Sequence, residues 1–152
     1  LKKEGKGLES LQENSSNKNI SNTNIRASLR IIGEDFDVQK ITEVLEIHPS
    51  KTWNKGDFIR NTEKKRTYTA WMYNTGLMES LNINTSIKQI KEVFFQKVDK
   101  IVALKNLYDL DISIDFVIVI ENEEPPAIYF DPDFIKFAAE IGAKFDIDTY
   151  IN

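Results

Sequence analysis

A polar loop expected over residues 49–65 carries the side chains best suited to binding a partner. Trp53 stands between two lysines, and the second of them, Lys55, is followed by Gly56 and Asp57. Tryptophan is enriched at binding hot spots, and long loops on small domains often carry function. We therefore predict that Trp53, Lys55 and Asp57 bind a partner or ligand. The alternative is structural, with Trp53 folded over the sheet edge and the lysines only solvating the loop.

A second candidate site lies near the C-terminus. Asp146 and Asp148 are two residues apart in an expected strand, so both project from one face together with Tyr150. Paired carboxylates suit a hard cation or acid–base chemistry, but the usual ligand spacings are absent, and Asp115 would contribute only if the fold brought it close. We expect no metal and no cofactor, and we assign Asp146, Asp148 and Tyr150 to partner binding. An ordinary solvent-facing strand is the alternative.

Missing residue types and motifs argue against several classes of enzyme. The chain has no cysteine, which excludes a thiol nucleophile, a zinc ribbon and an iron–sulfur site. Its one histidine, His48, precedes a proline at an expected helix end, where a protonated imidazole interacts favourably with the helix dipole. No nucleophile elbow, phosphate-binding loop or dinucleotide fingerprint occurs. We therefore expect a protein that is not an enzyme, and we name no catalytic residue.

Charge is distributed unevenly although the net charge is only −4. Residues 51–66 contain six basic and two acidic side chains, whereas residues 109–148 contain eleven acidic and two basic ones. The isoelectric point of about 5.1 is far below the value above ~9 that is typical of a dedicated nucleic-acid-binding domain. We therefore expect no nucleic-acid partner, and the acidic half suits a basic protein. The longest apolar run, at 116–120, is too short to cross a membrane.

Alternating and helical patterns of apolar residues predict the elements that position these sites. Strands are expected at residues 27–32, 66–73, 112–120, 127–130 and 144–151. One helix begins after Asp35 or Asp37, and the last begins at Pro132. Between them, a capping box from Ser86 to Gln89 is expected to open a long helix whose apolar stripe reaches Leu107.

The order strand, helix, strand, helix, strand, strand, helix, strand predicts an α+β domain. We expect a mainly antiparallel or mixed sheet of about five strands with three helices packed on it. The chain length of 152 residues fits one domain, which we place at residues 25–152. Residues 1–24 are rich in asparagine and serine and are expected to form a flexible arm, with a weak helix over residues 2–11.

Several motifs, taken in order, resemble a known bacterial family. They are LRIIG at 29–33, FDVQKITEVL at 36–45, PSKTWNKGD at 49–57, Trp71, FD at 130–131 and GAKFDIDTY at 142–150. This set is similar to the bacterial domain of unknown function 4279 over about residues 28–150. The chain departs from the family where Leu45 is followed by Glu46 instead of glycine. The resemblance implies a small α+β bacterial domain and brings no catalytic residues. Some relatives look like immunity proteins encoded near secreted toxins.

These observations lead us to expect a cytoplasmic, immunity-type binding protein that neutralises a partner toxin through an acidic and aromatic surface. Trp53, Trp71 and Tyr150 are the expected anchors, and Asp146 and Asp148 the charge complements. The alternative is a small-ligand-binding or enzymatic domain that uses a groove beside the Trp53 loop. A deep pocket with converging polar groups would favour that alternative, and a flat acidic patch would favour the protein partner. A third possibility is a structural interaction module tethered by the arm.

Overall fold

Strand β1 (Asn24–Gly33) lies near the centre of a six-stranded mixed sheet of order β2-β3-β1-β5-β6, with β4 paired to the start of β1. The computed structural model describes residues 22–152, so the helix expected over residues 2–11 lies outside the described part. β1 is antiparallel to both of its long neighbours, β3 (Thr69–Asn74) and β5 (Asp111–Ile120). β5 is parallel to the C-terminal edge strand β6 (Ala143–Ile151). The predicted α+β class is confirmed, with one strand more than expected.

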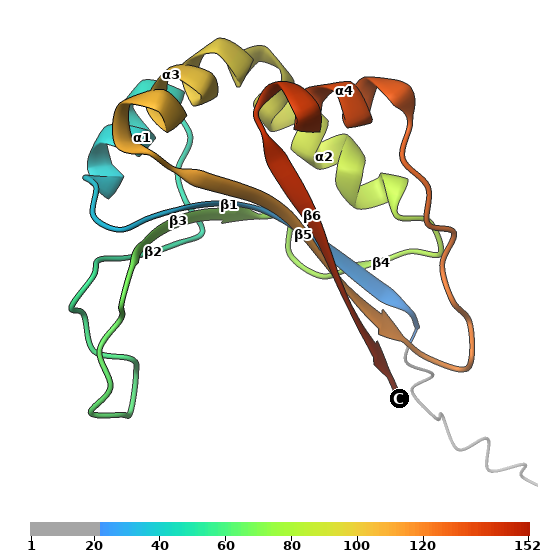
Figure 1. The fold of residues 1–152 in the computed structure, drawn as a ribbon. Helices are drawn as coiled ribbons and strands as arrows, with labels where there is room; N and C mark the ends of the chain where they lie inside the picture. The colour runs from blue at the N-terminus through green and yellow to red at the C-terminus, as the bar shows by residue number, and fades with distance from the viewer. Residues whose placement is uncertain (1–21) are drawn as a thin grey trace, which may run out of the picture.

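The helices all cover one face of this sheet (Figure 1). They are α1 (Val38–Leu45), α2 (Asn84–Phe94), α3 (Val98–Tyr108) and α4 (Pro132–Glu140), with a short 3-10 turn, η1 (Phe95–Lys97), between α2 and α3. Their buried apolar side chains meet those of β1 and β5, which alternate along each strand as the sequence predicts. None of the helices within residues 22–152 has the length and hydropathy needed to cross a bilayer.

The caps of α1 and α4 follow the sequence. The Asp37 carboxylate accepts a hydrogen bond from the amide of Gln39 at 2.9 Å and so caps α1, as expected. Pro132 occupies the first turn of α4, and Gly142 follows the helix with a φ of +63°, a left-handed conformation that glycine adopts without strain.

The capping box and the single long helix predicted after residue 85 are both wrong. α2 begins at Asn84, and the buried hydroxyl of Ser86 donates to the carbonyl of Ile83 at 2.9 Å. The Gln89 side chain instead donates to the Tyr73 hydroxyl at 2.9 Å, so neither residue caps the helix. The η1 turn separates α2, which packs on β1, from α3, which packs on α1 and α4. Leu107, expected on the buried stripe, is 68% exposed.

Three short segments also differ from the prediction. β2 (Lys51–Trp53), expected to be loop, pairs with β3, and β4 (Met78–Glu79) was not expected at all. Residues 127–130 form no strand, and Ala127 makes only an isolated bridge to Asn82. Residues 128–130 pair with no strand and lead into α4.

Candidate functional site

The face of the sheet opposite the helices is bare within the described part of the chain, and the sheet bends so that this face is concave (Figure 1). We call it the uncovered face. Its side chains come from alternate positions of the strands: Lys51, Trp53, Met72, Asn74, Arg26, Ser28, Arg30, Ser113, Asp115, Val117, Lys144, Asp146, Asp148 and Tyr150. Basic residues concentrate on β1 and β2, and carboxylates on β5 and β6. The fold therefore gathers the charged and aromatic residues of five strands on one surface.

Polar atoms that are buried without a hydrogen-bond partner also concentrate on this face. Among the described residues there are four such side-chain atoms: Arg26 Nε, Arg30 Nε, Trp53 Nε1 and Asp115 Oδ1. All four belong to side chains of the uncovered face. A buried polar group left unpaired costs about 1–3 kcal/mol, so most proteins avoid them except where function requires one. Within residues 22–152, the buried side-chain atoms that lack a partner thus all lie on this side of the sheet.

An ion pair crosses the middle of the uncovered face. Arg30 Nη1 on β1 donates to Asp115 Oδ2 on β5 at 3.0 Å, and the two side chains are only 28% and 16% exposed. The register places Asp146 of β6 directly beside Asp115. The Arg30 guanidinium therefore offsets the negative charge of Asp115, which has the carboxylate of Asp146 as its neighbour on β6.

Trp53 lies at the β2 edge of this face within a cluster of aromatic and basic side chains. The Arg66 guanidinium is 3.9 Å from the indole centroid, the Lys51 ammonium is 5.4 Å from it, and the Tyr68 ring is 5.6 Å away. Cation–π contacts of this kind contribute about 0.5–2 kcal/mol each. Trp53 thus holds Arg66 and Tyr68 against the sheet edge, and it is partly buried rather than free.

Lys55 and Asp57 organise the loop that follows β2. The Lys55 ammonium binds Glu34 at 3.0 Å, and this hydrogen bond, together with the lysine charge, lowers the pKa of the Glu34 carboxyl. Asp57 accepts a hydrogen bond from the Asn54 amide at 2.8 Å, and its carbonyl accepts one from the Arg66 amide at 2.7 Å. Both side chains are exposed, so they remain available to a partner, but the contacts that they make in the protein are with the loop and its base.

Trp71, predicted as an anchor, lies in the core and presents no surface to a partner. It is 0% exposed, because its register opposite Ile31 places it on the helix side of β3. Its indole nitrogen donates to the Thr42 hydroxyl of α1 at 3.0 Å, and its ring meets Phe94 of α2 edge to face. Trp71 therefore joins the sheet to two helices, and we drop it from the candidate site.

Asp146, Asp148 and Tyr150 share the uncovered face of the edge strand β6, as their spacing predicts. They lie beside Asp115, Val117 and Val119 of β5, and all three are exposed. Within residues 22–152, no group of three or more His, Asp or Glu side chains is arranged to hold a metal ion. The structure thus brings this acidic strip and the Trp53 cluster to one face but to opposite edges of it.

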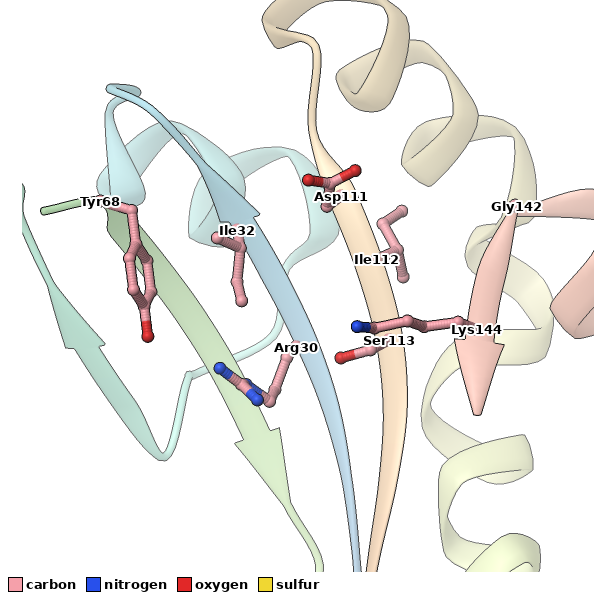
Figure 2. Close-up of a pocket in the computed structure, with 8 residues that line it drawn as sticks. All are labelled: Arg30, Ile32, Tyr68, Asp111, Ile112, Ser113, Gly142 and Lys144. Carbon is pink, nitrogen blue, oxygen red and sulfur yellow. The ribbon is translucent and has the colours of Figure 1, made fainter. Parts of the chain in front are cut away.

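A cavity of about 510 Å³ opens on the uncovered face, at the end of the sheet where β1 ends and β5 and β6 begin (Figure 2). Its walls are Arg30, Ile32, Tyr68, Asp111, Ile112, Ser113, Gly142 and Lys144. Tyr68 connects it to the Trp53 cluster. The sequence patterns predicted no binding role for any of these lining residues. The available signal was the polar alternation of Ser28 and Arg30 against apolar neighbours in β1, which marks a face that the helices do not cover.

Helices on one side of a mixed sheet, with the other side open, define a two-layer α+β domain. The chain belongs to the family described as a domain of unknown function (DUF4279), whose family model matches residues 23–152. The resemblance that the motifs indicate is therefore confirmed over nearly all of the described chain. No curated protein and no solved structure gave a significant match.

Proposed function

We propose that this domain is a binding protein that recognises a protein partner with the uncovered face of its sheet. The observation that carries the proposal is the gathering of charged and aromatic side chains from five strands on that face, which no helix of the described chain covers. Four buried side-chain polar atoms of the described residues also lack a hydrogen-bond partner on this face, so the side chains that carry them are not fully engaged within the protein.

The division of charge across the face supports the same proposal. Asp146 and Asp148 on β6 make no ion pair with any described residue, whereas Arg26 and Arg30 face the same side from β1. A partner with cationic side chains opposite β6 is therefore complementary to the acidic strip. Complementary charge of this kind raises the association rate and fixes the orientation of the complex.

We further propose that the partner is a basic protein, of the kind expected for a secreted toxin whose active site is covered by its immunity protein. This finer proposal is supported by the acidic strip of β6 and by the resemblance of some family members to immunity proteins.

The cavity beside Tyr68 favours a second candidate function, the binding of a small molecule. Its volume of about 510 Å³ falls in the range of ~300–1,000 Å³ that ligand pockets occupy. It lies beside the Trp53 cluster, where the alternative prediction from the sequence puts a groove.

Capture of a partner from a lysate of the source cells tests the proposal when variants of both faces are compared. The double variant Asp146→Asn/Asp148→Asn alters the uncovered face, and Lys136→Gln alters an exposed side chain of α4 on the helix side. We expect one stoichiometric protein to bind the wild type and the α4 variant and to be lost from the double variant. Equal capture by all three proteins contradicts the proposal. A small molecule retained through purification, with no protein captured, favours the second candidate.

A further inference from the structure

The cavity of Figure 2 collects hydrogen-bond donors that have no acceptor in the described part of the protein. Lys144 extends from β6 across β5, so that its ammonium lies beside the hydroxyl of Ser113, and the Tyr68 hydroxyl points toward Arg30 from the other side (Figure 2). The side chains of Lys144, Ser113 and Tyr68 form no hydrogen bond or ion pair with any described residue. Four donor-bearing side chains from four segments of the chain therefore converge on one space.

The ion pair with Asp115 holds the Arg30 guanidinium in place beside the cavity. Its Nη1 is occupied by Asp115 at 3.0 Å, which fixes the plane of the guanidinium, while the buried Nε has no partner. The Nη2 donors are also unused by the described residues. The Nη2 group can donate to a carboxylate oxygen, and a guanidinium that is already oriented by Asp115 loses little entropy on binding one.

The balance of charge around the cavity disfavours a doubly charged anion. Arg30 and Lys144 bring two positive charges, and Asp111 on the wall and Asp115 behind Arg30 bring two negative ones. A dianion such as phosphate meets repulsion from both carboxylates without a matching excess of positive charge. A carboxylate carries one charge, and its oxygens are acceptors only, as a site rich in donors requires.

We infer that this cavity binds a carboxylate group, with Arg30 and Lys144 supplying the charge and Ser113 and Tyr68 donating from their hydroxyls. The inference rests on the proposed function insofar as the carboxylate is an acidic side chain that the protein partner presents to the uncovered face. A free small carboxylic acid offers the same chemistry, and the experiment below separates the two sources.

A titration followed by the backbone amide resonances of the purified full chain tests the inference. The probes are N-acetylglutamic acid α-amide, its neutral analogue N-acetylglutamine amide, and acetate, with sodium chloride at matched ionic strength as the control. We expect the glutamate probe to give saturable shifts centred on Ser113, Lys144 and their neighbours, and the neutral analogue and sodium chloride to give none. Equal shifts from the glutamine probe or from sodium chloride overturn the inference.

Variants of Lys144 provide the sharper test, because this side chain is exposed and unpaired and can be changed without disturbing the core. Lys144→Gln is expected to weaken binding of the glutamate probe about tenfold, the loss of one charge-assisted hydrogen bond. Lys144→Arg keeps the charge and is expected to retain most of the affinity. Lys136→Gln on α4 is the matched control and leaves the affinity unchanged. Unaltered affinity in Lys144→Gln overturns the inference.

The outcomes separate this inference from the proposed function. Tighter binding of the glutamate probe than of acetate supports a side chain of a protein partner as the source, and equal binding supports a free carboxylic acid. If the chain captures a partner through the uncovered face but binds no carboxylate probe, the inference fails and the proposed function stands. If the probe binds in the cavity but this face captures no partner, the carboxylate site is supported and the proposed function fails.

Discussion

Arg30 and Asp115 meet at 3.0 Å across β1 and β5, although 85 residues separate them in the chain. Each also keeps a buried atom without a partner, Nε of the arginine and Oδ1 of the aspartate. The pair is therefore fixed in orientation but only partly satisfied. It lies in the middle of the uncovered face, beside the cavity that Arg30 lines.

Breaking this pair from one side is expected to destabilise the protein. Asp115→Leu leaves the arginine charge half-buried and unpaired, which costs about 1–3 kcal/mol of unfolding free energy. The double variant Arg30→Met/Asp115→Leu replaces both charges with apolar groups and is expected to recover most of that loss. Urea denaturation of the single and double variants measures both effects. If the double variant loses as much unfolding free energy as the two single variants lose together, the two side chains are not coupled.

The two tryptophans are expected to report different environments. Trp71 is 0% exposed and Trp53 is partly buried at the sheet edge. Trp53→Phe, which leaves only Trp71, should therefore emit at the shorter wavelength and resist quenching by acrylamide. Trp71→Phe should emit at the longer wavelength, be quenched readily and unfold more easily, because it loses the hydrogen bond to Thr42 and core volume, together about 1–3 kcal/mol. Equal quenching of the two variants would contradict the assigned positions.

Glu46 is expected to be a source of local strain at the end of α1. Its φ of +57° is left-handed, a conformation that costs a residue with a side chain about 1–2 kcal/mol and glycine very little. Its carboxylate, which is 71% exposed, also contacts Lys97 and Lys100, and ion pairs with so exposed a group contribute little to stability. Glu46→Gln removes the ion pairs but keeps the strain, so Glu46→Gly should be more stable than Glu46→Gln by about 1 kcal/mol. Thermal unfolding of the two variants measures the difference, and equal stability would rule out strain.

Lys55 is expected to control the titration of Glu34. The lysine hydrogen bond and charge lower the pKa of Glu34 below its ordinary value of 4.5, so Lys55→Met should raise that pKa toward 4.5. Because the pKa is lowered in the folded state, the contact stabilises the protein above pH 4.5, and the effect is lost as the pH falls through the folded-state pKa. Carboxyl carbon resonances followed from neutral to acidic pH give the pKa directly. Lys64→Met is the control in the same loop, and an unchanged Glu34 pKa in Lys55→Met would show that the lysine has no such effect.

Much of the fold could be predicted because its long strands alternate clearly. Ala27, Leu29 and Ile31 share one face of β1, and the five alternate apolar residues from Ile112 to Ile120 share one face of β5, so both strands were identified. β2 was missed because Lys51–Trp53 is short, polar and stabilised only by pairing with β3. The false capping box at Ser86 arose because its residue types fit the motif, whereas burial turned the hydroxyl toward Ile83.

The candidate site was predictable only in part, since most of it depends on strand register. The spacing of Asp146, Asp148 and Tyr150 was enough to place them on one face. No local pattern shows that Arg30 meets Asp115, or that Lys144 extends over Ser113, because these contacts require the pairing of β1, β5 and β6. Trp71 was misassigned because an aromatic residue in a strand has the same local signature on a covered face as on an open one.

The position of β1 in the sheet also determines when the protein can fold during its synthesis. β1 comes first among the described strands, yet its longest partner, β5, begins at Asp111. At a translation rate of about 5–20 residues per second, the 85 residues between Arg30 and Asp115 take on the order of ten seconds to make. For that time the apolar face of β1 is not fully covered, and the edge that pairs with β5 stays open. Pairing across so long a separation is also intrinsically slow. Until β5 has been made, the centre of the sheet cannot close.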